Sequence, residues 1–416
     1  SRISLKGVKR RHPGVFTNTC HLRPPSADLH NTACVLHALY PSLFSEGHHP
    51  MFKLCKPQAL AAAVAMSLGA SSVFAAGEVR VYNWSDYIDE DLLTQFEEET
   101  GIELIYDVFD SNEVLETKML SGGSGYDVVV PSGTFLQRQI SAGAFQELDA
   151  AQLPNSGNLW GVIEERTAQY DPGNAYSINY MWGTTGLGVN VGKVTEALGE
   201  DAPIDSLALV FDPANMEKLA ECGVHFLDAP AEMIPAALQY IGEDPDSQDP
   251  DVIALTEPVL AAVRPYIQKF HSSEYINALA NGDICLAIGW SGDVLQARDR
   301  AAEAGNGVTV EYSIPKQGAL MWFDQMAIPA DAKNVGEAHE FLNFIMRPEV
   351  IAKASNYVYY ANGNMASQPL LDKEVIDDPA IYPSAETTNN LFTVTAFPPR
   401  AQRGLTRAWT KVKTGQ

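Results

Sequence analysis

Three tryptophans in this sequence stand two or three residues ahead of an aspartate. The pairs are Trp84 with Asp86 in "YNWSDYI", Trp290 with Asp293 in "AIGWSGD", and Trp322 with Asp324 in "LMWFDQM". The faces of tryptophan rings attract cations, by about 0.5–2 kcal/mol each, and their apolar bulk packs against methylene groups. Carboxylates accept charge-assisted hydrogen bonds from ammonium groups. The repeated pairing therefore predicts a site for a ligand that is both apolar and cationic.

The carboxylates of such a site narrow the choice of ligand. Several acids in one cleft repel one another and raise each other's pKa unless a ligand supplies positive charge. A chain of methylenes with an ammonium group at each end meets both demands, so the pairs predict a linear polyamine. Tyr359 and Tyr360, in the turn-prone segment "ASNYVYYANG", are further aromatic candidates. For a single pair a simpler interpretation exists: Asp86 could cap a helix over 87–98, with Trp84 and Tyr87 in the core.

The elements that must position these residues alternate between strands and helices. An expected strand over 78–84 is followed by a helix over 90–101, a strand over 102–109, a helix over 111–122 and an apolar strand over 126–132. This order predicts an α/β sheet with right-handed crossovers, in which ligands bind beyond the carboxyl ends of strands. The segment 176–190, rich in glycine and aromatic residues, is expected to be an extended crossing between two domains.

The first 76 residues are expected to lie outside the working protein. Residues 1–50 lack a sustained apolar period, and we interpret them as upstream translated sequence or a fusion scar, with an unrecognised N-terminal extension as the alternative. Residues 51–76 combine two lysines, a short apolar stretch and a run of small residues, which is typical of a secretory signal peptide cleaved near Ala75 or Ala76. The remaining chain, about 340 residues, is long enough for two lobes.

The chain after residue 76 is strongly acidic. Residues 1–76 contain eight of the 28 basic residues but only two of the 52 acidic residues. The chain after residue 76 therefore has 50 acidic and 20 basic residues, a formal charge of −30. This balance argues against nucleic acid as a partner and favours cationic small molecules, although an acidic surface that only confers solubility is the alternative. Cys222 and Cys285 remain, and after export they would form a disulfide or stay as buried thiols. Their neighbours show no metal-ligand spacing, so no metal site is expected.

From Glu78 to Gln416 the sequence resembles the periplasmic polyamine-binding proteins of bacterial ABC importers, the putrescine- and spermidine-binding group. The matching segments include "YNWSDYI", "YDVFDSNEVLE", "YMWGTTG", "CGVHFLDAPAE", "FHSSEYINALANGDICLAIGW", "SIPKQGALMWFD" and "RAWTKVK". The resemblance implies the two-lobed, type II periplasmic substrate-binding fold of the α/β class, in which each lobe has a mixed, mainly parallel sheet flanked by helices. We expect lobe 1 to comprise residues 77–181 and 310–375, and lobe 2 residues 182–309 and 376–416.

The resemblance also implies a set of ligand-binding residues. Carried over position by position, they are Trp84, Ser85, Asp86, Tyr87, Ser132, Glu232, Ser272, Trp290, Asp293, Trp322, Asp324 and Tyr360. The four acids of this set would hold ammonium groups, while its three tryptophans and Tyr360 would line the methylenes. Glu232 and Ser132 rest on the resemblance alone.

Further properties follow from the same resemblance. It implies a disulfide between Cys222 and Cys285, no cofactor, a periplasmic location, a monomer, and an ABC permease of the inner membrane as partner. Similar proteins carry Phe or Trp where this chain has Trp322, and the larger indole suits a longer, more highly charged chain such as spermidine. Ser85 and Asp86 instead fit the putrescine-binding pattern, so we expect both ligands to bind.

A carbohydrate-active enzyme or a sugar-binding protein is the main alternative, because paired acids and tryptophan platforms also serve sugars. The sequence motifs of other enzyme classes are not found. The segment "GWSGD" has Asp293 where the nucleophile elbow G-x-S-x-G requires glycine. None of His225, His271 and His339 has the spacing of a catalytic triad. We therefore expect a binding protein and not an enzyme, with a role in transport or, as a second possibility, in signalling to a receptor. The basic segment 400–413 is expected to be a solvated helix face or a permease contact.

Overall fold

The computed structural model describes residues 77–415. The expected upstream segment 1–50 and signal peptide 51–76 lie outside the described residues, so both stay predictions. Within residues 77–415, no helix is long and apolar enough to cross a membrane.

Ten strands of this part of the chain form one sheet, in the order β2-β1-β3-β9-β4-β7-β5-β6, with β8 and β10 paired to β4. Their bounds are β1 Glu78–Trp84, β2 Glu103–Phe109, β3 Val128–Val129, β4 Ser177–Asn190, β5 Val224–Phe226, β6 Lys269–Phe270, β7 Leu286–Trp290, β8 Val310–Ser313, β9 Leu320–Ala327 and β10 Ala361–Asn362. Strand β1 is parallel to β2 and β3, and β5 is parallel to β6 and β7. Between these groups, β4 and β9 run antiparallel to each other.

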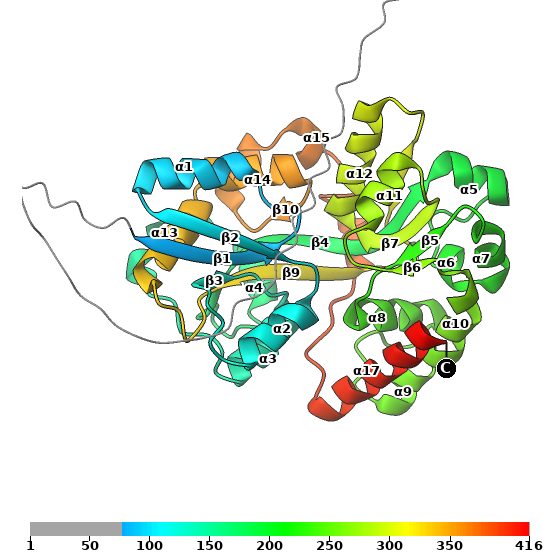
Figure 1. The fold of residues 1–416 in the computed structure, drawn as a ribbon, viewed down its shortest axis with the longest axis horizontal. Coiled ribbons are helices and arrows are strands. Elements are labelled where there is room, and N and C mark those ends of the chain that lie inside the picture. The colour runs from blue at the N-terminus through cyan, green and yellow to red at the C-terminus, as the bar shows by residue number, and fades with distance from the viewer. Residues whose placement is uncertain (1–76, 416) are drawn as a thin grey trace, which may run out of the picture. The chain divides into compact units, whose positions relative to one another are not determined.

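Helices cover both faces of this sheet (Figure 1). Helices α1 and α14 lie on one side of β1 and β2, with α2 and α3 on the other; beside β7, α11 and α12 lie on one side and α8 and α17 on the other. The longer helices are α1 Glu90–Thr100, α2 Asn112–Leu120, α3 Gly133–Ser141, α5 Val191–Leu198, α8 Pro230–Ile241, α10 Thr256–Val263, α12 Ser291–Ala304, α13 Val335–Ile345, α14 Pro348–Val358 and α17 Pro399–Thr414. The shorter ones are α4 Gly161–Thr167, α6 Ala208–Phe211, α7 Pro213–Leu219, α9 Pro250–Ala254, α11 Tyr275–Asn281, α15 Lys373–Ile376 and α16 Ala385–Asn389.

Two large apolar cores lie on either side of the crossing strands. One draws on buried residues between 79 and 181 and between 326 and 360, and the other on residues between 187 and 310 and between 397 and 412. All 14 residues of β4 are buried, and β4 pairs with β7, β8, β9 and β10, which confirms that the segment predicted over 176–190 is extended; its role as a crossing between two domains stays a prediction. The α/β architecture is confirmed, while the lobe boundaries at 181/182, 309/310 and 375/376 stay predictions.

The turn after β1 differs from the simplest sequence interpretation. Asp86 does not cap a helix over 87–98: helix α1 begins at Glu90, and Asp89 caps it by accepting a hydrogen bond from the backbone N–H of Asp91. Asp86 instead adopts a φ of 52°, in the left-handed region that Asp tolerates better than most residues. The chain therefore bends sharply just before Tyr87.

Other expected elements are confirmed with small shifts. Strand β1 ends at Trp84 as predicted, Ser111 caps α2, and Gly101 ends α1 in the left-handed conformation. The strand expected over 126–132 is shorter, because only Val128 and Val129 form ladder pairs. The basic segment 400–413 lies in α17, whose apolar side is buried, with Lys411 and Lys413 paired to Glu257 and Asp228.

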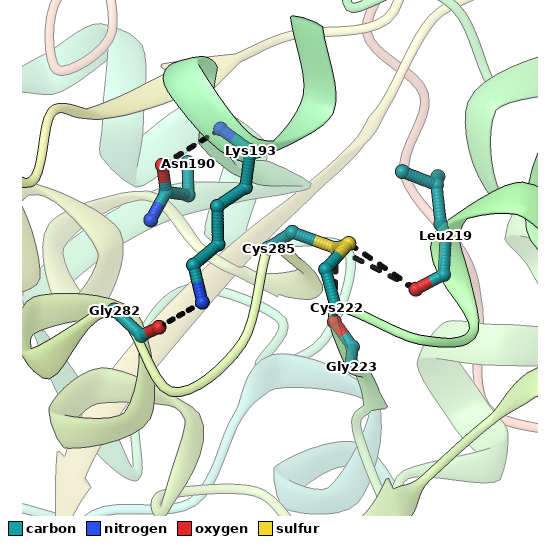
Figure 2. Close-up of a disulfide and its surroundings, with 7 residues drawn as sticks. All are labelled: Asn190, Lys193, Leu219, Cys222, Gly223, Gly282 and Cys285. Carbon is teal, nitrogen blue, oxygen red and sulfur yellow. Dashed lines mark hydrogen bonds between the residues drawn. A yellow bond between two sulfur atoms is a disulfide. The ribbon is translucent and has the colours of Figure 1, made fainter. Parts of the chain in front are cut away.

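A disulfide joins Cys222 to Cys285, as the resemblance implied (Figure 2). It connects the turn after α7 to the start of β7, across a sequence separation of 63 residues. Nearby, Asn190 caps α5 by accepting from the backbone N–H of Lys193, whose Nζ donates to the carbonyl of Gly282 (Figure 2). The disulfide and the hydrogen bond of Lys193 thus link neighbouring loops beside the apolar core that includes residues 187–310.

The disulfide predicts a measurable stability difference. We expect the double variant Cys222→Ala/Cys285→Ala to lose about 2–4 kcal/mol of unfolding free energy, because the bond restricts a long loop of the unfolded chain. Urea unfolding of the oxidised wild type, the reduced wild type and the variant would measure it. The reduced protein should match the variant; a variant as stable as the oxidised protein would contradict the prediction.

Candidate functional site

One cavity, which opens to solvent, gathers eleven of the twelve predicted site residues; the space within it that no atom fills, solvent at its mouth included, is about 450 Å³. Its walls are formed by Trp84, Ser85, Tyr87, Phe109, Asp110, Asn112, Ser132, Glu232, Ser272, Ser273, Trp290, Asp293, Trp322, Asp324 and Tyr360. Asp86 is the predicted residue that is absent from these walls. We refer to this space as the first cavity.

Strand ends bring these residues together. Trp84 is the last residue of β1, Phe109 of β2 and Trp290 of β7, so three carboxyl ends of strands meet at the first cavity. Trp322 and Asp324 lie two positions apart within β9, where the alternation of side chains places both on the same face.

Helix starts supply the other polar groups. Ser132 is the residue before α3, Glu232 lies in the first turn of α8, and Asp293 lies in the first turn of α12. The positive end of a helix dipole favours a carboxylate at such a position, which partly offsets the loss of water around it.

Hydroxyl groups hold the two aspartates in fixed orientations. Asp324, only 4% exposed, accepts hydrogen bonds from Ser132 Oγ at 2.6 Å and from the Tyr87 hydroxyl at 2.9 Å. Asp293, 6% exposed, accepts from the hydroxyls of Tyr275 and Tyr360, both at 2.7 Å. Neutral donors orient both carboxylates, and no cation lies on either of them within residues 77–415.

Burial changes the protonation of the three central acids. It raises the pKa of Asp293, Asp324 and Glu232 to about 7, and the hydroxyl donors offset this effect only in part. Glu232 accepts from Thr185 Oγ1 at 2.5 Å. Burial also holds the pKa of Tyr87 and Tyr360 well above its usual value, so these hydroxyls stay protonated and continue to donate.

Aromatic rings form the rest of the walls in edge-to-face contact. The Trp84 and Trp290 rings lie 5.4 Å apart, the Trp322 and Tyr360 rings 5.4 Å apart, and the Tyr87 and Tyr360 rings 5.1 Å apart. Such edge-to-face contacts fix the orientations of the rings. A glycine permits the packing of Tyr360: a Cβ added at Gly292 would lie 2.4 Å from its ring.

Asp86 lies apart from the first cavity. Its side chain is 44% exposed, and its Oδ1 lies 2.8 Å from Nη2 of Arg300 on α12. The left-handed turn at Asp86 directs Tyr87, and not Asp86, into the cavity. Tyr359, the other aromatic candidate of its segment, also lies outside the walls and packs with a third apolar cluster.

Four wall residues were missed by the sequence analysis: Phe109, Asp110, Asn112 and Ser273. Asp110 accepts a hydrogen bond from Ser85 Oγ at 2.5 Å, and Asn112 donates to Ser132 Oγ at 2.9 Å. A usable signal was present, because β2 was predicted to end at Phe109, and polar residues just beyond a strand that neighbours β1 belong to the same edge.

The charges of the first cavity are all of one sign. Asp110, Glu232, Asp293 and Asp324 line it, and no Lys, Arg or His of residues 77–415 does. The same part of the chain has no group of three or more His, Cys, Asp or Glu placed to hold a metal ion. The arrangement therefore suits an organic cation with apolar segments between its charges.

Comparison with known proteins gives consistent likenesses. The family model for bacterial extracellular solute-binding proteins matches residues 91–383. The chain is 53% identical over 339 residues to the putrescine-binding periplasmic protein PotF of Escherichia coli, covering 81% of this chain and 92% of that protein. It is 41% identical to a putrescine/agmatine-binding protein of Pseudomonas aeruginosa, covering 88% of this chain and all of that protein.

Solved structures show the same likeness. The spermidine/putrescine ABC transporter substrate-binding protein PotD of Streptococcus pneumoniae superposes with a TM-score of 0.66 at 29% identity, covering 82% of this chain and 99% of that chain. The two-lobed, type II fold expected from the sequence is confirmed by this likeness.

The raised pKa values predict how stability depends on pH. The folded state holds protons on Asp293, Asp324 and Glu232 up to about pH 7, whereas the unfolded chain releases them near pH 4. The folded state thus binds more protons between pH 4 and 7, so the unfolding free energy of the ligand-free protein should fall as the pH rises through this window. Urea unfolding at pH 5, 6, 7 and 8 would measure the slope.

The variant Asp324→Asn tests the cause of this slope. The unfolding free energy of the variant should fall less steeply with rising pH. At pH 8 the variant should be more stable than the wild type by roughly 1–3 kcal/mol, because it lacks one buried charge. Asp201→Asn, at an exposed position, is the matched control and should keep the wild-type slope. An Asp324→Asn slope equal to that of the wild type would contradict the assignment.

Proposed function

Because the chain belongs to the bacterial extracellular solute-binding proteins, we propose that it captures linear polyamines, putrescine and spermidine, in the first cavity and delivers them to an ABC permease. The observation that carries this proposal is the one-signed wall of carboxylates between aromatic rings, which the described residues leave without a cation. The relatives' names support it, since they bind putrescine, agmatine or spermidine.

The geometry suggests how a diamine is held. One ammonium group binds Asp293 and the other binds Asp324 with Glu232 nearby, while Trp84, Trp290 and the ring of Trp322 line the methylenes. The hydroxyl donors have already oriented the carboxylates, so little ordering accompanies binding. Each ammonium favours the ionised acid and returns its pKa toward the usual range.

Selectivity against neutral ligands has the same origin. A sugar would leave the three central acids without positive charge, and a site that holds unpaired buried charges rejects ligands that cannot neutralise them. A glycosidase also needs two carboxyl groups whose environments push their pKa values apart, whereas burial shifts the pKa of all three acids here in the same direction, upward. The carbohydrate alternative is therefore not favoured, and the protein is a binding protein and not an enzyme.

Location and partners belong to the same proposal. The relatives are periplasmic proteins, and one neighbour is a component of an ABC transporter, which supports a periplasmic location and a permease partner. We infer that the protein acts as a monomer whose lobes close over the ligand, with β4 and β9 as the strands between them. Of the twelve residues of the original prediction, the proposed site keeps the eleven that line the first cavity and omits Asp86.

Isothermal titration of purified protein, refolded to remove bound ligand, tests the proposal. Putrescine and spermidine should each bind saturably, a neutral sugar should not, and Asp324→Asn should weaken putrescine binding at least tenfold. Affinity should rise from pH 6 to pH 8, because the acids ionise through about pH 7 while the amines stay charged. Absence of binding, or tighter binding at lower pH, would overturn the proposal.

A second prediction concerns Trp322. Trp322→Phe should weaken spermidine binding about threefold to tenfold more than putrescine binding, because the indole offers more area and a stronger quadrupole to the more highly charged chain. Trp409→Phe, on α17 and outside the cavity walls, is the matched control and should leave both affinities unchanged. If Trp322→Phe keeps the wild-type ratio of the two affinities, the indole does not set selectivity.

A further inference from the structure

A second cavity adjoins the first; the space within it that no atom fills, open solvent included, is about 510 Å³. The two share part of their walls, including Glu232, Trp290 and Trp322, so these side chains stand at the junction. The shared side chains place the two cavities next to each other, so the route from one to the other passes these residues.

The walls of the second cavity beyond the junction are mainly apolar. Phe135, Leu320, Phe323 and Val394 are among the apolar residues of these walls, in contrast to the acidic walls of the first cavity. Among the described residues that line the second cavity, Glu113 and Glu232 are the charged ones. Such a chamber suits a short hydrocarbon segment that ends in a single positive charge.

Glu113 lacks the partner that a carboxylate in such a place requires. It lies in the first turn of α2, and its Oε1 is buried without a hydrogen-bond partner within residues 77–415. The nearby Arg138 donates from Nε to Glu116 Oε1 at 2.9 Å, and its Nη2 makes no hydrogen bond to Glu113; its charge offsets the effect of burial on the pKa of Glu113 only in part. Burial raises the pKa of Glu113 to about 7, in keeping with an acid that awaits a cation.

We propose that the second cavity is the subsite for the third cationic group of a linear triamine, with Glu113 as its counter-charge. The inference rests on the proposed function of the first cavity and extends it. A diamine occupies the first cavity alone, whereas the additional arm of a triamine passes Trp322 at the junction, lies along the apolar walls and places its terminal ammonium at Glu113. Chain-length selectivity then depends on a residue that a diamine never reaches.

Titration calorimetry of Glu113→Gln with putrescine and spermidine tests the subsite, since glutamine keeps the shape of the side chain and removes its charge. Spermidine affinity should fall at least tenfold, and putrescine affinity should change less than twofold. Glu98→Gln, an exposed acid on α1, is the matched control for net charge and should change neither affinity. A loss equal for both amines, or for neither, would overturn the subsite.

A second variant fills the space instead of removing the charge. Ala231 lines the second cavity and not the first, so Ala231→Leu should also weaken spermidine binding while putrescine binds as before. Unchanged spermidine affinity in this variant would overturn the subsite. Failure of the wild type to bind spermidine while it binds putrescine would refute the subsite and the spermidine part of the proposed function but leave diamine capture standing, whereas failure to bind either amine would refute the whole proposed function.

Discussion

Three carboxylates held largely out of water, with only neutral hydroxyls to support them, are the constraint on which the site depends. Glu232, Asp293 and Asp324 receive hydrogen bonds that fix their orientation but leave their charge uncompensated. Hydrogen bonds from neutral donors occupy the acceptor positions of a buried carboxylate, but they do not neutralise its charge. A cation is still needed to offset the cost of burying that charge. The protein therefore carries a local instability that a ligand of the right charge relieves, and recognition follows from that relief.

The rest of the fold serves to keep these groups close together and dry. Strands β1, β2 and β7 end at the same place, and the crossing strand β9 delivers Trp322 and Asp324 between them. The absence of a side chain at Gly292 lets Tyr360 approach α12 closely enough to reach Asp293. The two apolar cores contain none of the three acids, so their packing supplies the stability that the buried charges reduce.

Much of this arrangement was predictable from the sequence, and the exceptions have physical causes. Two of the three tryptophan–aspartate pairs, at Trp84 and Trp290, marked strand ends correctly, because strand periodicity and the position of ligands in α/β sheets are local or general rules. The prediction that Asp86 lines the site was wrong, because a residue in the left-handed conformation changes which neighbouring side chain faces inward. The pattern of residue types does not report φ. Glu113 was not found because its position depends on how α2 meets the second cavity, which is a tertiary property. The pairing of Cys222 with Cys285 came from the resemblance, and residue counting alone left free thiols open.

Asp293 and Tyr360 belong to different parts of the chain, and their contact joins them twice. Tyr360 donates its hydroxyl proton to Oδ1 of Asp293 at 2.7 Å, and the Tyr360 hydroxyl oxygen accepts a hydrogen bond from the backbone N–H of Asp293 at 3.1 Å. Any opening that separates α12 from Tyr360 would also dismantle half of this anion site. Measured affinity would then be the product of the intrinsic affinity and the fraction of molecules already assembled. Substitutions far from the ligand that shift this fraction would scale the affinities for all ligands by one factor, leaving their ranking intact.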